Sequence, residues 1–420
     1  MSIDPTNILP NSNQQPNQPI ANPFGNDGGS RGYGIIGLPP EPVRSKSSGP
    51  HRVKFSGEGA DYFGIWIVNL LLIVVTAGIY SPWAKVRREK YFHQHTQIDG
   101  SSLDYHGNPI AILIGRVLTL GLIAMVSFGN QLSLTVAIAA GLFLAGIIPF
   151  AMQRSIRFRL FNTSYRGLRF GFHGSVAQAY GISWLIVLFG YAAFIAPAWL
   201  NEVAKGDLWV AGLATFGLFI AYPFFHAAWR RFVISHAQYG SVNAQAKFST
   251  SSFIWIYLKS WLLMIVIPGV VIAAIVIYPM WSSPGLHSGA YFGAILAVPL
   301  IFVFYAFVLS FAPIVAARLQ NLCWNENTVV SDQNNSQVAV FTSDLSVKKF
   351  VTLQLKNQIL TVLTLGLYRP YAAIATAKMR LEAISISSLT FVDDVAARAG
   401  QQKSAIGDQA LDAVGLDFSL

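Results

Sequence analysis

Two apolar segments of this chain, 288 residues apart, carry the same series of polar and small residues. Residues 69–84 read NLLLIVVTAGIYSPWA and residues 357–372 read NQILTVLTLGLYRPYA, with eight of 16 positions identical. A chance match between two hydrophobic runs would supply Leu and Val but not Thr-x-Gly-x-Tyr-x-Pro. The match therefore predicts an internally repeated membrane protein. The repeated positions are our first candidate pathway or repeat-motif residues: Asn69, Thr76, Gly78, Tyr80 and Pro82, matched by Asn357, Thr364, Gly366, Tyr368 and Pro370.

Charge is scarce in this sequence and unevenly placed. Hydrophobic residues make up 53% of the 420 residues and charged residues 11%, less than half the charged share of an average soluble domain. The two longest intervals without Asp, Glu, Lys or Arg are 117–153 and 260–317. A bilayer-spanning helix needs roughly 20 apolar residues. We expect eight hydrophobic elements, near 62–80, 109–128, 131–151, 176–198, 208–228, 253–280, 290–317 and 350–372.

The expected fold class is an all-α polytopic membrane protein, built as an internally repeated helical bundle with short cytoplasmic β-strands. Residues 1–50 are rich in Asn, Pro, Gln and Gly and predict a disordered tail. Residues 51–392 form the predicted repeated transmembrane domain, and residues 393–420 a polar C-terminal tail. A single cysteine, Cys323, excludes an intrachain disulfide framework.

The basic residues indicate the orientation of the chain. They follow the hydrophobic elements directly, as at Arg87, Arg154, Arg230 and Arg318. Such juxtamembrane placement predicts that these loops are cytoplasmic. It also accounts for the net charge of +10 without a nucleic-acid partner.

A longer unit surrounds the repeated motif. Five elements end in a proline followed by basic residues, at Pro82, Pro149, Pro223, Pro313 and Pro370. Alternating apolar and polar residues beside a Gly turn then predict short strands. A Phe-x-small signature leads into the following element at four places, which predicts four copies around an axis normal to the membrane. These are Phe55-Ser-Gly57, Phe172-His-Gly174, Phe248-Ser-Thr250 and Phe341-Thr-Ser343.

Two topologies are compatible with the first and last elements. In one, both elements are short and re-entrant, and the chain reverses near Thr-x-Gly-x-Tyr, so that six other elements span the membrane. Re-entry keeps the basic residues of both ends on the cytoplasmic side. In the other, all eight elements are straight spans and both termini lie outside. The first element, from Phe63 to Tyr80, has 18 residues, which does not decide between them.

Few side chains in the apolar elements carry chemistry. Acidic residues are absent from the predicted membrane cores, which argues against a carboxylate proton relay. His226 is the best intramembrane titratable candidate, with interfacial packing as the plainer interpretation. Arg116 either binds a carbonyl or an anionic group, or reaches the lipid headgroups. Asn69 and Asn357 predict interhelical hydrogen bonds or, as a matched pair, positions along a pathway.

We expect no metal site, cofactor or enzyme activity. His93, His95 and His106 lack the spacing of a metal cluster, since residues two apart on a helix point in different directions. The sequence contains no HExxH, GxSxG, Walker A or GxGxxG motif.

Three segments resemble one known family. Residues 55–91 (FSGEGADYFGIWIVNLLLIVVTAGIYSPWAKVRREKY), 162–175 (NTSYRGLRFGFHGS) and 364–372 (TLGLYRPYA) are similar to motifs of the YjgN-like family, a bacterial domain of unknown function. The resemblance extends from about residue 51 to the C-terminus. It implies a multi-pass protein of the bacterial inner membrane, and no reaction or substrate.

Two functions therefore compete. The first is a transporter or channel-like pathway for a small solute or lipid, favoured by the paired, glycine-broken elements. The second is a non-transporting scaffold that binds a protein partner of unknown identity through its cytoplasmic strands.

Overall fold

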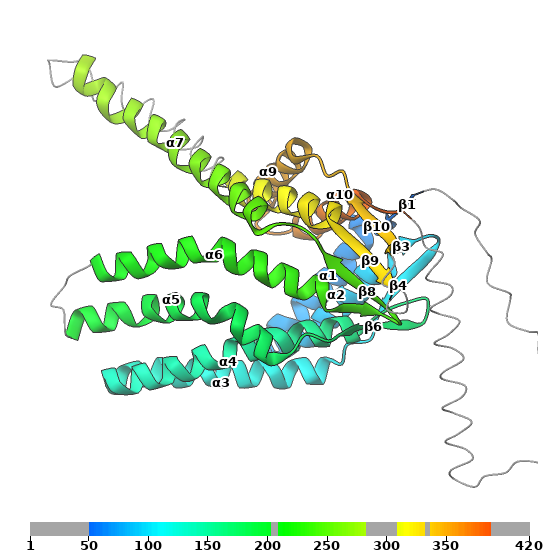
Figure 1. Ribbon diagram of the computed structural model, residues 1–420, viewed down its shortest axis with the longest axis horizontal. Coiled ribbons are helices and arrows are strands. Elements are labelled where there is room, and N and C mark those ends of the chain that lie inside the picture. The colour runs from blue at the N-terminus through cyan, green and yellow to red at the C-terminus, as the bar shows by residue number, and fades with distance from the viewer. Residues whose placement is uncertain (1–49, 203–208, 283–308, 332–336, 388–420) are drawn as a thin grey trace, which may run out of the picture. The chain divides into compact units, whose positions relative to one another are not determined.

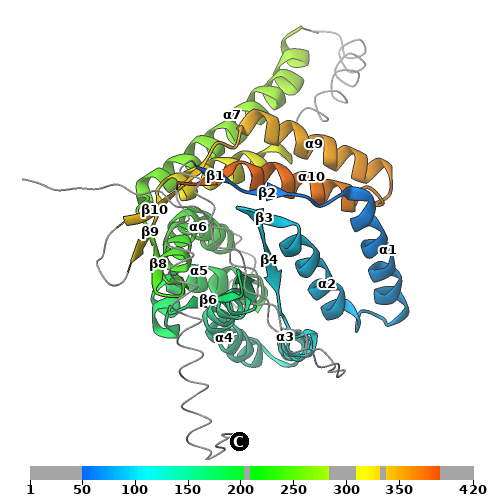
Figure 2. The ribbon, with the colours of Figure 1, turned by 90° about the vertical axis from the view of Figure 1, so that its right-hand side faces the viewer.

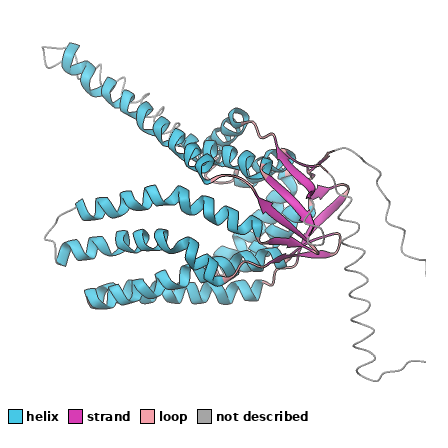
Figure 3. Ribbon diagram, viewed as in Figure 1, coloured by secondary structure: helices cyan, strands magenta, loops and turns pink. Residues whose placement is uncertain are grey.

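The computed structural model describes residues 50–202, 209–282, 309–331 and 337–387. The predicted tails, apart from residue 50, and most of the element predicted near 290–317 lie outside these ranges. Helices and strands alternate in a regular order, with the strands gathered at one end of the helices (Figures 1 and 3). The labelled helices are α1 (Gly59–Val75), α2 (Ser81–Gln94), α3 (Pro109–Leu132), α4 (Leu134–Phe161), α5 (Val176–Glu202), α6 (Trp209–Ser235), α7 (Thr250–Ser282), α9 (Val347–Leu363) and α10 (Arg369–Glu382).

The described strands belong to one antiparallel sheet of 11 strands, ordered β1-β11-β10-β9-β8-β7-β6-β5-β4-β3-β2. Its two end strands, β1 and β2, are separated only by Val53, so one segment pairs with β11 on one side and β3 on the other. The sheet therefore closes on itself. The strands are β1 (His51–Arg52), β2 (Lys54–Phe55), β3 (Thr96–Ile98), β4 (Ser101–Tyr105), β5 (Thr163–Tyr165), β6 (Leu168–Phe172), β7 (Ala237–Tyr239), β8 (Val242–Ala246), β9 (Asn327–Ser331), β10 (Gln337–Ser343) and β11 (Ile384–Ile386).

Apolar side chains fill the centre of this ring of strands. Tyr165, Tyr239 and Ile386 belong to one buried cluster, which strands from all around the ring contact. The Tyr165 hydroxyl donates to the Ile98 carbonyl at 2.8 Å, and the Tyr239 hydroxyl donates to the Tyr165 carbonyl at 3.0 Å. Because the polar tips of both tyrosines are satisfied by backbone, this interior is a packed core.

The helices come in pairs, and each pair begins and ends at the sheet. A leading strand enters the first helix, the second helix runs back, and a returning strand follows (Figure 2). The described chain contains five such units. They are β2-α1-α2-β3, β4-α3-α4-β5, β6-α5-α6-β7, β8-α7 with the helical segment 309–325 and β9, and β10-α9-α10-β11.

One backbone hydrogen bond closes every unit. The N–H of the residue after the leading strand donates to the C=O of the residue that directly follows the second helix. A buried proline lies thirteen residues before each of these carbonyls. The bonds join Ser56 to His95 at 3.0 Å, His106 to Asn162 at 2.8 Å, His173 to His236 at 3.0 Å, Lys247 to Glu326 at 3.0 Å and Asp344 to Ala383 at 3.0 Å.

This register corrects the prediction of four copies. The missed unit begins at Tyr105, which replaces the expected Phe and lies over Gly107 as Phe172 lies over Gly174. In the last two units the sizes are exchanged, and a small residue precedes a large one. Ala246 and Ser343 hold the register position of Phe55, and Phe248 and Leu345 that of Gly57. The lead-in signatures assigned to Phe248 and Phe341 were therefore displaced by two residues each.

Four elements also differ from the predicted ones in length or continuity. Pro149 and Pro223 lie inside continuous helices, α4 and α6, whereas Pro82 and Pro370 lie in the first turn of α2 and α10. The long helices thus include the basic residues that follow each proline. The predicted elements 62–80 and 350–372 are each broken by a reversal of the chain.

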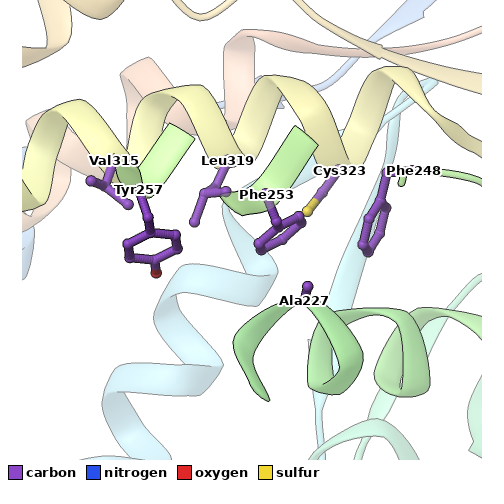
Figure 4. Close-up of a cluster of buried hydrophobic side chains, with 7 residues drawn as sticks. All are labelled: Ala227, Phe248, Phe253, Tyr257, Val315, Leu319 and Cys323. Carbon is purple, nitrogen blue, oxygen red and sulfur yellow. The ribbon is translucent and has the colours of Figure 1, made fainter. Parts of the chain in front are cut away.

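Apolar clusters join the helices to the sheet. Figure 4 shows the cluster in which Phe248, Phe253 and Tyr257 meet Cys323 of the helical segment 309–325. Burial raises the pKa of the Cys323 thiol to about 11. Very little thiolate is therefore present at neutral pH, and Cys323 is a packing residue of this cluster.

We expect Gly174→Ala to destabilise the protein by roughly 1–3 kcal/mol. A Cβ at this position would lie 2.5 Å from the rings of both Phe172 and Phe232. Thermal unfolding of purified protein measures the change. Gly181→Ala is the matched control on the same helical hairpin, because a Cβ there meets nothing within 4 Å. Equal effects of the two substitutions would contradict the close packing described for the leading strand.

Candidate functional site

The repeated Thr-x-Gly-x-Tyr-x-Pro motif forms the tips of two helical hairpins, α1/α2 and α9/α10. In the first, α1 ends at Val75, residues 76–80 turn, and α2 begins at Ser81. The N–H of Gly78 donates to the Ile73 carbonyl at 2.8 Å and that of Ala77 to the Val74 carbonyl at 3.1 Å. This pair of bonds is a Schellman motif. The second hairpin has the same pair, at 2.7 Å and 3.0 Å.

The threonine of each motif supplies bonds that the backbone lacks. The Thr76 hydroxyl donates to the Leu72 carbonyl at 2.7 Å and accepts from the Tyr80 N–H at 3.0 Å. Thr364 does the same with Leu360 and Tyr368, at 2.7 Å and 2.9 Å. With these bonds, every backbone N–H of residues 76–81 and 364–369 has a partner. The proline that follows at position 82 or 370 has no N–H to satisfy.

Both turns require left-handed backbone at two successive residues. Gly78 and Gly366 have φ of 91° and 94°, which glycine adopts without steric cost. The preceding residues, Ala77 and Leu365, have φ of 48° and 50°. Non-glycine residues rarely adopt this conformation. The same strain at both tips shows that the motif encodes one local structure twice.

Large apolar side chains are exposed around these tips. Val75 is 82% exposed, Ile79 62%, Leu363 73% and Leu365 95%. Water does not favour such a surface, whereas a hydrocarbon environment does. A turn with all its N–H groups satisfied internally is what that environment demands.

The two matched asparagines lie inside the hairpins. Asn69 and Asn357 are 6% and 3% exposed. The Asn357 amide donates to the Ala372 carbonyl and the Thr376 hydroxyl, each at 3.3 Å, and so joins α9 to α10. The Oδ1 atoms of both asparagines lack a hydrogen-bond partner. Asn357 therefore makes the predicted interhelical bond, and neither residue reaches the open surface of its hairpin.

Arg116 contacts the first tip. From α3 its guanidinium donates a hydrogen bond to the hydroxyl of Ser81, the first residue of α2. In the described ranges Arg116 forms no ion pair. The partner is a hydroxyl, which is neither the carbonyl or anionic group nor the lipid headgroup that the sequence predicted, so both predicted roles stay predictions.

The second tip carries a guanidinium of its own, which the sequence analysis missed. Arg369 is the first residue of α10 and lies at the position of Ser81 in the repeat. Its side chain is exposed. The sequence could have identified it, because Arg369 is the only charged residue in the repeated segment 357–372.

His226 packs between α6 and α7. Its Nδ1 lies 2.7 Å from the Tyr257 hydroxyl, and Arg230 Nε donates to its Nε2 at 3.2 Å. The ring also makes edge contacts with Phe253. These partners are those of a packing residue. His226 also lies more than 100 residues along the chain from either repeat motif.

The three histidines near α2 bond to separate groups. His93 and His95 each contact the backbone oxygen four residues earlier, at 2.6 Å and 2.8 Å. His106 contacts the Ser164 hydroxyl at 2.8 Å. Within the ranges that the structure describes, no group of three metal-ligating side chains is found.

The structure defines a class of protein in which helical hairpins stand on a closed sheet. Two of the hairpins end in apolar turns whose backbone N–H groups are bonded internally. Residues 50–413 match the family described as bacterial protein of unknown function (DUF898). The chain belongs to this family. The resemblance to YjgN-like proteins is confirmed.

Curated relatives carry a common name. The inner membrane protein YjgN of Salmonella typhimurium is 25% identical over 357 residues, covering 79% of this chain and 87% of the relative. YjgN of Escherichia coli O157:H7 is 24% identical over 188 residues, covering 40% of this chain and 46% of the relative. No solved structure matches the chain.

We expect Thr76→Val to destabilise the protein by roughly 1–3 kcal/mol, because the Tyr80 N–H loses its acceptor at a buried or lipid-facing turn. Thr76→Ser keeps the hydroxyl and should unfold near the wild-type temperature. Thr119→Val is the matched control, since that hydroxyl bonds only a carbonyl of its own helix. If Thr76→Val and Thr119→Val lower the unfolding temperature equally, the hydroxyl bridge has no special role.

Proposed function

We propose that this protein is a multi-pass protein of the bacterial inner membrane that forms a pathway for a small solute or lipid along its two short hairpins. The proposal includes no catalysed reaction and no cofactor. The names of the relatives in Salmonella and Escherichia support the location. Helix lengths and the polar groups at the hairpin tips support the pathway.

Helix length separates the hairpins into two kinds. α1 and α9 have 17 residues, or about 25 Å, less than a hydrocarbon core of roughly 30 Å. α3 and α4 have 24 and 28 residues. They contain the two stretches found to be long and apolar enough to cross, Pro109–Gly129 and Ile138–Phe161. In the proposed topology the long hairpins cross and return, and the short ones re-enter.

The hydrogen bond from Arg116 to Ser81 carries the proposal. It places a guanidinium without a described acidic partner at a helix N-terminus inside the proposed membrane region. Ionisable residues at such depth mark substrate pathways. Broken helices whose N-termini point at polar substrate groups are the usual construction of transporter sites.

The proposed pathway runs along the two short hairpins at the periphery of the helices and does not pass through the centre of the sheet. The apolar cluster around Tyr165 and Tyr239 fills the middle of the sheet, so an axial route would have to displace that core. The short hairpins are neighbours, since α1 packs against α10. Among the described strands the closed sheet also leaves no end strand free, which argues against edge pairing as a means for the competing scaffold function to recruit a partner.

Cysteine labelling tests the re-entrant topology. We expect Ser56→Cys and Ser102→Cys, before and after the first hairpin, to react with an impermeant maleimide only after permeabilisation. Ile79→Cys at the tip should react in neither condition, because lipid excludes the reagent. Lys205→Cys, between α5 and α6, is the outside control. Native Cys323 stays silent because it is buried and its pKa is raised to about 11. Outside labelling of Ser56→Cys alone would restore a straight first span.

Arg116→Gln tests the pathway. We expect it to abolish uptake of solutes or movement of labelled lipids in proteoliposomes, with unfolding temperature little changed. Lys259→Gln is the control, since that cation belongs to α7 and lies over the ring of exposed Trp255. Wild-type protein that moves no solute or lipid, and is stabilised by none of a broad panel, would contradict the pathway. A stoichiometric crosslinked partner, lost when residues 160–175 are replaced, would favour the scaffold.

A further inference from the structure

Each short hairpin has an open groove between its two helices, close to the sheet. The groove of α1/α2 has a volume of about 430 Å³ and that of α9/α10 about 480 Å³. The two grooves occupy corresponding places in the repeat. Ile65 and Lys90 line the first where Leu353 and Lys378 line the second.

Charge distinguishes the two grooves. The first is lined by Arg87 and Lys90 and by no acidic residue. In the described ranges neither cation forms an ion pair. The lining of the second groove is balanced between two lysines and two acidic residues, since Ala375 replaces Arg87 and Glu382 replaces Gln94. Its Asp344 forms an ion pair with Arg52 at 2.8 Å. Of the two grooves, the first thus has a basic lining without an acidic residue.

An apolar stripe continues the first groove toward the hairpin tip. Val68 lines the groove and is 47% exposed, and Leu71 and Val75 follow on the same face of α1 with 58% and 82% exposed. The floor is held by Tyr91, whose hydroxyl accepts from the Glu58 N–H at 3.0 Å and donates to the Glu58 carbonyl at 3.1 Å. Lys90 therefore lies toward the sheet end of the groove, and Arg87 lies near its middle with its guanidinium over the Tyr80 ring at 5.7 Å. The apolar surface continues from there toward the hairpin tip.

We infer that the α1/α2 groove binds an anionic membrane lipid, with the headgroup phosphate at Arg87 and Lys90 and an acyl chain along Val68, Leu71 and Val75. The inference rests on the proposed membrane location of the hairpin. Charge complementarity and the change from basic to apolar lining along one groove select this occupant. Clustered cations at the cytoplasmic surface recognise such headgroups, and the positive-inside pattern puts this groove there.

The test compares lipids of equal chain length on the purified full chain. We expect phosphatidylglycerol, but not phosphatidylcholine, to remain bound in native mass spectrometry and to raise the unfolding temperature. Arg87→Gln with Lys90→Gln should weaken phosphatidylglycerol binding at least about tenfold. Lys378→Gln, at the position of Lys90 in the balanced groove, should leave binding unchanged. Ala375→Arg with Glu382→Gln should create a second binding event.

Several results would overturn the inference. These are equal binding of the two lipids, equal loss from Arg87→Gln/Lys90→Gln and Lys378→Gln, or displacement of phosphatidylglycerol by soluble glycerol phosphate. Displacement by glycerol phosphate would show that the headgroup binds without the apolar stripe. Unchanged phosphatidylglycerol binding by Leu71→Gln would show the same. Lipid-free unfolding temperatures separate binding from folding, because Arg87 and Lys90 are exposed. The labelling of Ile79→Cys does not depend on lipid binding. If phosphatidylglycerol does not bind but Ile79→Cys is protected from the reagent, the inference is wrong and the proposed topology is still supported.

Discussion

The hydrogen bond that closes each helical unit is the constraint on which the other features depend. By tying the end of the second helix to the residue after the leading strand, it returns both ends of every hairpin to one sheet. Five such closures bring the strands together in sequence, and the segment 51–55 completes the ring. The helices are then obliged to leave the sheet on the same side, whatever their length.

In the proposed topology, the length of its helices then decides whether a hairpin turns in water or in the bilayer. A hairpin whose helices exceed the bilayer thickness turns in water, where its backbone groups find partners. In the proposed re-entrant topology, a shorter one turns in hydrocarbon and must satisfy its own N–H groups. The Thr76 and Thr364 hydroxyls and the Schellman bonds meet that requirement at the two short tips. The threonine, glycine and proline of the repeated motif thus complete the turn itself, and the proposed pathway depends on the groups beside it, such as Arg116 and Ser81.

Sequence reasoning located this turn because Thr, Gly, Tyr and Pro act within a few residues of one another. It missed the unit that begins at Tyr105, because a search for Phe-x-small excludes Tyr although the two rings pack alike over a following glycine. The lead-in signatures at Phe248 and Phe341 were placed two residues away from their true positions. At Ala246/Phe248 and Ser343/Leu345 the small residue precedes the large one, which reverses the Phe-x-small pattern. It also passed over Arg369. Contacts such as Arg116 with Ser81 join different units and leave no trace in local spacing.

The sequence by itself determined the apolar character of the chain, the matched reversals at residues 76–80 and 364–368, and the basic ends of the returning helices. These features depend on side-chain chemistry and on backbone bonds within one turn. Only the tertiary structure decided that the sheet closes, that its centre is filled, and that two grooves of equal position differ in charge. The first two depend on residues hundreds of positions apart, such as His51 pairing with Ile386, whose proximity arises only when all the units have closed. The third depends on which side chains of α1/α2 and of α9/α10 face the space between their helices.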